Sequence, residues 1–113
     1  MSTKDSVPRP RGRSEYEIHF DSSHARKGWG DLMAVRRDDL VSAWDFLTRN
    51  PETVTALSYP LKDSLSSLVR GGVTHTRWQL KLSATHGARI WSFVDGRKVH
   101  LEKVFTSHPN ETL

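Results

Sequence analysis

The sequence contains no cysteine among its 113 residues, which excludes a disulfide framework and a thiolate site. No apolar run approaches the roughly 18 residues that a membrane-spanning helix needs. The N-terminal stretch is basic but lacks an apolar segment, so we expect no secretory signal. Together these absences predict a cytoplasmic protein without membrane contact.

Recognisable cofactor motifs are absent too. The chain has no phosphate-binding loop, no dinucleotide fingerprint and no zinc-protease motif. Its six histidines show no spacing typical of metal ligands, and the nucleophile elbow of serine hydrolases is missing. We therefore predict no metal site and no small-molecule cofactor.

Hydrophobic residues make up only 35% of the chain, so its four Trp and four Phe must supply much of the core packing. A chain of this length is expected to form one domain. Residues 1–14 combine prolines, a glycine and basic residues with almost no apolar side chain, which predicts a disordered basic tail. We assign the single folded domain to residues 15–113.

The most informative feature that is present is the placement of positive charge. The chain has a formal net charge of +4, and residues 77–105 alone hold six basic and two acidic side chains, an equal excess. The basic ones are Arg77, Lys81, Arg89, Arg97, Lys98 and Lys103. Such a stretch suits a polyanion such as RNA, or an acidic protein, although a solvated sheet face has the same composition.

The same stretch predicts three strands joined by turns. The strand segments are rich in β-branched and aromatic residues and lie at 77–84, 87–94 and 98–105. Asp95-Gly96 is the strongest hairpin signal, because a type I′ turn needs positive φ at both central positions. His86-Gly87 is a weaker turn signal. An antiparallel three-stranded meander follows from this pattern.

The N-terminal part predicts a fourth strand and two helices. Alternating apolar residues at 15–21 predict a half-buried strand that joins the meander. Helical spacing predicts a first helix at 23–34, in which Gly28 and Gly30 mark a bend or a close approach to a neighbour. A second helix begins at Asp38 and Asp39 and stops at Asn50-Pro51.

The predicted fold is therefore α+β. It consists of an N-terminal strand, a two-helix antiparallel hairpin and a three-stranded antiparallel meander, which form a twisted sheet with the helices packed on one face. Trp29 and Trp44 recur on the apolar stripes of the helices and are expected in the core rather than in a ligand platform. Residues 53–76 show no clear period, and we assign them no element.

This order of elements resembles the RelE/ParE superfamily of toxins from bacterial type II toxin–antitoxin pairs. The resemblance covers residues 15–109 and depends on four local features. They are the helical hairpin ending in Asn50-Pro51, the segment Pro60-Leu61-Lys62, the strand pair RWQLKL…ARIW at 77–91, and Val104-Phe105-Thr106-Ser107-His108-Pro109. The resemblance implies a RelE-like fold and a cognate antitoxin as partner.

The resemblance also implies a reaction, because many members cut mRNA in the ribosomal A site without a metal. The ribose 2′-OH attacks the adjacent phosphate, which requires positive groups, a proton acceptor and a proton donor. The implied catalytic residues are Arg89, Lys81 and His108. The implied RNA-binding residues are Arg77, Lys62, Lys103 and Trp91, the last of which we place in the core in preference to a stacking role.

Two departures from the family pattern keep other functions open. Pro109 follows His108 where several nucleases carry a tyrosine, and no tyrosine occurs after Tyr59. One alternative is a non-enzymatic toxin of the same fold that binds a protein such as DNA gyrase through the charged helical hairpin. The other is a small basic RNA- or protein-binding module without toxicity, whose RNA binding would weaken steeply with salt.

Overall fold

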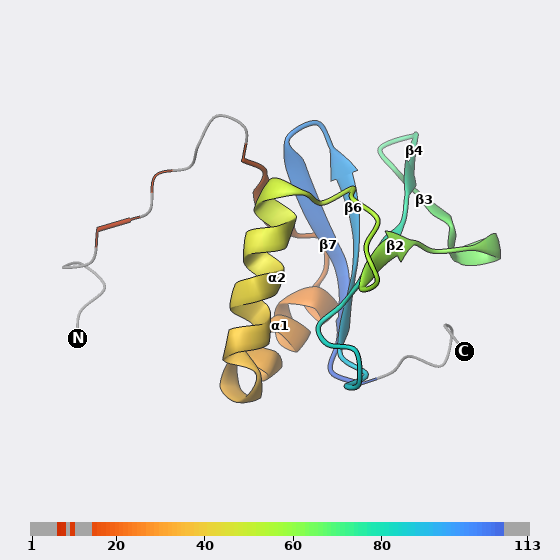
Figure 1. Cartoon of the computed structure of the whole chain (residues 1–113). Helices are drawn as coiled ribbons and strands as arrows, with labels where there is room; N and C mark the ends of the chain where they lie inside the picture. Colours follow the sequence, from red (N-terminus) through yellow and green to blue (C-terminus); the bar gives the residue numbers. More distant parts are fainter. Residues whose placement is uncertain (1–6, 9, 11–14, 108–113) are drawn as a thin grey trace.

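The computed structural model describes residues 7, 8, 10 and 15–107, so the predicted tail at 1–14 lies mostly outside the described residues. Figure 1 shows an α+β arrangement, as the sequence predicts. The elements in chain order are β1 (Glu17–Phe20), α1 (Ser23–Val35), α2 (Arg37–Arg49), β2 (Ser58–Pro60), the 3₁₀ helix η2 (Asp63–Leu65), β3 (Ser67–Arg70), β4 (Val73–Thr76), β5 (Trp78–Lys81), β6 (Arg89–Asp95) and β7 (Lys98–Phe105).

The main sheet has five strands in the order β1-β7-β6-β5-β2. Strands β5, β6 and β7 form the predicted antiparallel meander. The turn between β6 and β7 is Gly96-Arg97 rather than the expected Asp95-Gly96, because Asp95 still pairs with Lys98. Gly96 has a φ of 61° and Arg97 has no positive φ, so the turn is not the expected type I′. Strand β1 joins the sheet as the predicted fourth strand and runs parallel to β7. The stretch left unassigned at 53–76 supplies β2, which pairs with β5, and a separate β3–β4 hairpin.

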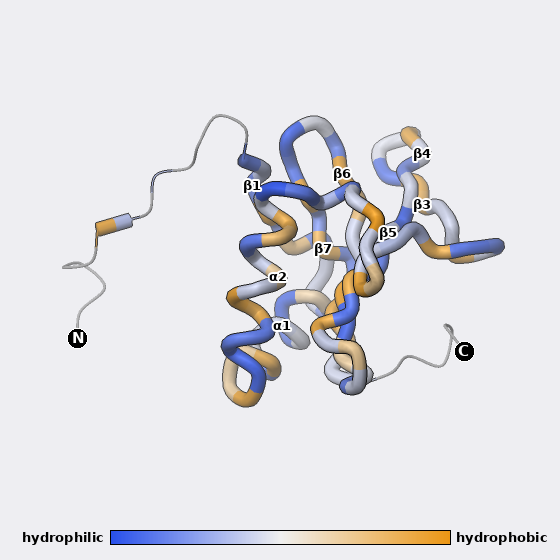
Figure 2. Tube along the Cα trace, viewed as in Figure 1, coloured by the Kyte–Doolittle hydropathy of each residue, from blue (hydrophilic) through white to orange (hydrophobic). Residues whose placement is uncertain are grey.

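Both helices pack on one face of the sheet, whereas the β3–β4 hairpin lies on the other side (Figure 1). Hydrophobic and hydrophilic residues alternate along the helices (Figure 2), which gives each one an apolar side for the core. The core residues from the helices, the sheet and the connection between β5 and β6 are Ala25, Leu32, Leu40, Ala43, Leu47, Leu80, Leu82, Ala88, Ile90, Val99, Leu101 and Val104. Trp29 packs against this core, as predicted, and Trp44 is half-buried.

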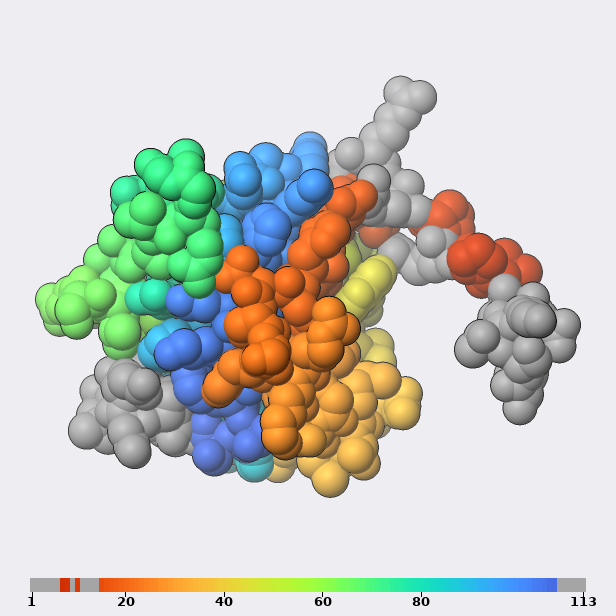
Figure 3. All heavy atoms as spheres, turned by 180° about the vertical axis from the view of Figure 1, so that it is seen from behind, coloured from red at the N-terminus to blue at the C-terminus, as the bar shows by residue number. Residues whose placement is uncertain are grey.

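Helix α1 also covers the part of β7 that β1 leaves open. Strand β1 pairs with β7 only at residues 98–101, and Figure 3 shows α1 continuing alongside β7. Beyond β1, the backbone N–H of Val104 donates to Nδ1 of His24 at 3.4 Å. A Cβ atom on Gly28 would overlap the carbonyl group of Val104, so Gly28 marks the close approach that its position in the helix predicts. Among the described residues, no helix is long and apolar enough to cross a membrane.

Candidate functional site

The sheet face opposite the helices gathers cations and aromatic rings in two cross-strand rows. Leu80, Ile90 and Val104 point into the helical core, so the residues that alternate with them point the other way. One row places Lys81 opposite Arg89, and Arg89 opposite Phe105. The next row is Tyr59, Gln79, Trp91 and Lys103. We call these seven residues the cationic face: Tyr59, Gln79, Lys81, Arg89, Trp91, Lys103 and Phe105.

Arg89 is the most unusual residue of the cationic face, because its side chain is charged and the residue is only 5% exposed. Its Nε donates to the carbonyl oxygen of Gly87 at 3.0 Å. Within residues 15–107, no carboxylate forms an ion pair with Arg89 or with Lys81. Two like charges on directly opposed positions repel each other. An anion held between them would relieve this repulsion, and a guanidinium suits phosphate geometry.

Trp91 lies beneath the cations rather than open to solvent, at 1% exposure. Its Nε1 donates to Oε1 of Gln79 at 2.9 Å, and its ring meets that of Phe105 edge-on with centroids 4.9 Å apart. Nζ of Lys103 lies 5.4 Å from the ring centroid, and Cζ of Arg77 lies 5.5 Å from it. The structure thus places Trp91 in packing, the role preferred from the sequence, and leaves no ring face free for a base.

Arg77 lies beside the cationic face but is committed to an ion pair within the protein. Its guanidinium contacts the carboxylate of Glu102 at two points, 2.7 and 2.8 Å long, and donates to the carbonyl oxygen of Leu65 at 3.1 Å. Glu102 is only 7% exposed and is skipped in the register between β6 and β7, where a β-bulge occurs. Arg70 contacts Asp21 at 3.0 Å and Glu102 at 3.9 Å, so the network links the β3–β4 hairpin to the sheet.

The remaining predicted site residues are distributed differently. Lys103 belongs to the cationic face, whereas Lys62 is exposed in the link before η2 and outside the two rows. His108 lies outside the described residues. The structure therefore brings Lys81, Arg89 and Lys103 together, with Arg77 adjacent. Among residues 15–107, no cluster of three or more potential metal ligands occurs.

Three residues of the cationic face, Gln79, Phe105 and Tyr59, are not among the site residues that the sequence predicts. Of these, Tyr59 is the one with a hydroxyl proton to donate. Its ring centroid lies 5.8 Å from Nζ of Lys81, and its hydroxyl oxygen accepts a hydrogen bond from Nε2 of Gln79 at 2.9 Å. Strand β2 has only three residues and ends in Pro60, which is too short for an alternating pattern to be visible. A tyrosine directly before a proline, which favours extended backbone, was the available signal.

A second cluster of rings continues along the same sheet face. The ring of Phe93 stacks on His100 with centroids 4.8 Å apart. The ring of His75, from the β3–β4 hairpin, is tilted against Phe93 with centroids 4.9 Å apart. Burial lowers the pKa of His100 below its ordinary value. Nearby His19 and Lys98 lower this pKa further, whereas Asp21 and Asp95 act in the opposite direction. His100 is therefore held in its neutral form more strongly than a free histidine.

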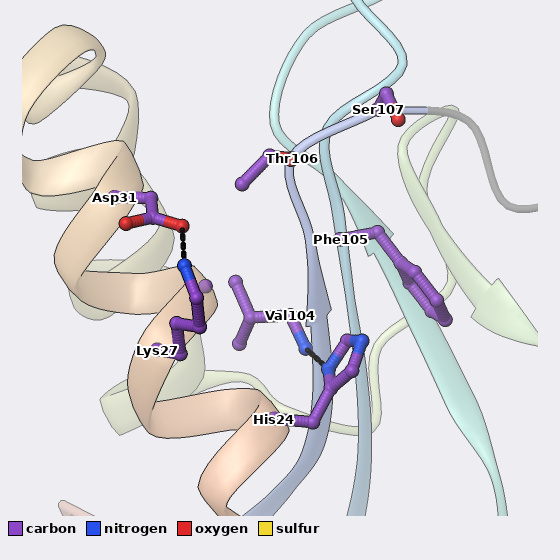
Figure 4. Close-up of a pocket in the computed structure, with 8 residues that line it drawn as sticks. His24, Lys27, Asp31, Val104, Phe105, Thr106 and Ser107 are labelled. Atoms are coloured by element: carbon purple, nitrogen blue, oxygen red, sulfur yellow. Dashed lines mark hydrogen bonds and ion pairs between the residues drawn. The ribbon is translucent and has the colours of Figure 1, made fainter.

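Another hollow lies between α1 and the end of β7, with a volume of about 210 Å³. Figure 4 shows His24 reaching toward Val104 and Phe105, opposite the ion pair between Lys27 and Asp31. The rings of His24 and Phe105 meet edge-on with centroids 5.2 Å apart. This hollow borders the cationic face but shares only Phe105 with it.

No protein-family model matches the sequence, and no curated protein matches it. The chain is similar in structure to a copper-bound mutant toxin from Helicobacter pylori, determined by crystallography. The TM-score is 0.58 at 12% sequence identity, over 82% of this chain and 94% of that one. At this identity the match shows a shared fold, which supports the toxin fold expected from the sequence.

Proposed function

We propose that the chain is a toxin of a bacterial type II toxin–antitoxin pair and belongs to the RelE/ParE superfamily. In this proposal it is a ribosome-dependent, metal-independent mRNA endonuclease that inhibits translation in the cytoplasm. The observation that carries the proposal is the opposed pair Lys81 and Arg89, which has no carboxylate partner within residues 15–107. The fold shared with a bacterial toxin is additional support.

The chemistry of RNA cleavage fits this pair of cations. When a 2′-OH attacks the adjacent phosphate, a P–O2′ bond forms and the P–O5′ bond breaks, leaving a 2′,3′-cyclic phosphate and a 5′-OH. Negative charge builds on the phosphoryl oxygens in the transition state, and fixed cations stabilise it. Arg89 and Lys81 would hold these oxygens, with His108 as the proton acceptor for the 2′-OH. Lys103 and Lys62 would guide the RNA backbone.

The proposal also predicts the partners. The mRNA and the ribosome supply the polyanion that the cationic face fits, because phosphate contacts by Lys and Arg dominate the affinity of such surfaces. A cognate antitoxin would silence the toxin by covering the cationic face with an acidic segment. The proposal requires no cofactor.

Induced expression in a bacterial host tests the proposal, with the wild type beside Arg89→Ala and the control Arg37→Ala. Arg37 is exposed at the start of α2, so its loss should leave cleavage unchanged. Wild type and Arg37→Ala should arrest growth and cut a reporter message within its translated region, as detected by primer extension. Arg89→Ala should do neither. Growth arrest without a cut message, abolished by Arg37→Ala, would instead indicate a protein target bound by the helical hairpin.

A further inference from the structure

A chain of two hydrogen bonds shows that the Tyr59 hydroxyl accepts from Gln79 and does not donate to it. The indole Nε1 of Trp91 is a donor only, so the atom of Gln79 that it meets at 2.9 Å must be the carbonyl oxygen Oε1. The amide nitrogen of Gln79 then faces Tyr59, and it too is a donor only. The Tyr59 oxygen is therefore the acceptor at 2.9 Å, and its own proton is left for another group.

This relay of hydrogen bonds from Trp91 through Gln79 to Tyr59 is buried at Trp91 and Gln79 and partly exposed at Tyr59. Trp91 is 1% exposed and Gln79 is 2% exposed, so neither side chain has room to turn over. Tyr59 is half-buried on the edge strand β2, and its hydroxyl ends the relay. Gln79 and Trp91 thus act as positioning residues that present a phenol with a free proton.

The ring of Tyr59 lies beside Lys81, one of the two cations proposed to hold phosphate. Nζ of Lys81 is 5.8 Å from the centroid of the Tyr59 ring, and Lys81 is opposite Arg89 in the next strand. Glu102, the buried carboxylate beside the cationic face, is occupied by Arg77. Among residues 15–107, Tyr16 is the other tyrosine, and it lies under Arg97, with Cζ 4.8 Å from its ring centroid. Tyr59 is therefore the phenol within reach of a phosphate bound to Lys81.

We infer that Tyr59 is the general acid that protonates the leaving 5′-oxygen, an inference that rests on the proposed nuclease function. As the P–O5′ bond breaks, its electron pair goes to O5′, which takes the hydroxyl proton of Tyr59. The 2′-OH proton passes to the proposed proton acceptor, His108, as the P–O2′ bond forms. The products are a 2′,3′-cyclic phosphate and a 5′-OH, and water returns a proton to the tyrosinate. The bond from Gln79 stabilises the tyrosinate while it lasts.

Tyr59→Phe removes the proton donor while keeping the ring, and Tyr16→Phe is a matched control. Cleavage is measured on ribosomes programmed with a short mRNA that carries either a normal phosphate or a 5′-bridging sulfur at the cut position. A thiolate leaves readily without a proton, so the sulfur mRNA bypasses the need for a general acid. Tyr59→Phe should slow cleavage of the oxygen mRNA by about 10²- to 10⁴-fold. It should cut the sulfur mRNA near the wild-type rate, and Tyr16→Phe should match the wild type on both.

The sulfur mRNA also reports whether the variant is folded and bound, because an unfolded variant cuts neither substrate. Equal slowing on both substrates would show that Tyr59 only supports the structure, and the inference would be overturned. Wild-type cleavage of the oxygen mRNA by Tyr59→Phe would overturn it as well. In both cases the nuclease function would still stand, because the wild type cuts. If the wild type cuts neither mRNA, the proposed function fails and the role of Tyr59 fails with it.

Discussion

The Arg77 guanidinium and the Glu102 carboxylate form a two-point ion pair, with Nε–Oε1 at 2.7 Å and Nη2–Oε2 at 2.8 Å. Their side chains are only 12% and 9% exposed, so neither charge is well solvated alone. Removing one partner of such a pair leaves a buried charge without compensation, which costs about 3 kcal/mol. We expect Arg77→Ala to lower the free energy of unfolding by that amount, as measured by chemical denaturation.

The double variant Arg77→Met with Glu102→Gln separates stability from RNA contact. Replacing both charges by neutral groups of similar size should restore most of the lost stability, because no buried charge remains. A direct role of Arg77 in RNA binding would show a different pattern. Arg77→Ala would then keep the stability of the wild type and lose cleavage activity.

Two glycines of α1 make a matched pair for testing the contact between helix and strand. A Cβ on Gly28 would overlap the Val104 carbonyl group, whereas a Cβ on Gly30 would meet open space. Gly28→Ala should therefore destabilise the fold by about 2 kcal/mol through overpacking. Gly30→Ala should stabilise it by about 0.5–1 kcal/mol, since alanine favours a helix. Thermal unfolding measures both, and equal effects would contradict the close approach.

The elements that sequence patterns predicted are those whose signals are local. The glycine of the Asp95-Gly96 signal and the alternation along β5 specify the meander without help from distant residues, although the turn itself is Gly96-Arg97. The meander places Lys81 opposite Arg89. The parallel pairing of β1 with β7 joins segments some 80 residues apart, so no local period indicates its direction. Alternation showed that a strand existed there but not which way its neighbour ran.

The remaining elements and contacts depend on information that a pattern does not carry. Strand β2 is three residues long, and in the β3–β4 hairpin Leu68 is the one buried residue, so no alternating pattern marks these strands. The partner of Arg77 was unpredictable for a related reason. Glu102 reaches it from a β-bulge, and a one-residue bulge changes which side chains share a face.

His100 should make the stability of the fold sensitive to acid. Burial lowers its pKa in the folded state, so the unfolded chain binds the proton more readily. Unfolding therefore becomes more favourable as pH falls through the ordinary histidine range, and the loss levels off below the lowered pKa. Between pH 7 and pH 5, the Tm of the wild type should fall more than that of His100→Gln. An equal or steeper fall in the variant would contradict the burial of an uncharged ring.

We expect Arg89 to make the fold less stable than an apolar side chain would at the same position. Arg89 is 5% exposed, and its Nε donates to a backbone carbonyl oxygen. Within residues 15–107, no carboxylate pairs with it. Burying an uncompensated charge is unfavourable, and an apolar side chain of similar length avoids that cost. We expect Arg89→Met to be at least as stable as the wild type, by up to about 1 kcal/mol, and inactive in mRNA cleavage.

Inorganic phosphate provides the matching control for Arg89→Met. A ligand that binds only the folded protein raises its Tm. If Arg89 and Lys81 form an anion site, phosphate should raise the Tm of the wild type and have a smaller effect on the variant, with sodium chloride at equal ionic strength as reference. Destabilisation of Arg89→Met by several kcal/mol, with the same response to phosphate, would show instead that the guanidinium holds the sheet together and binds no anion.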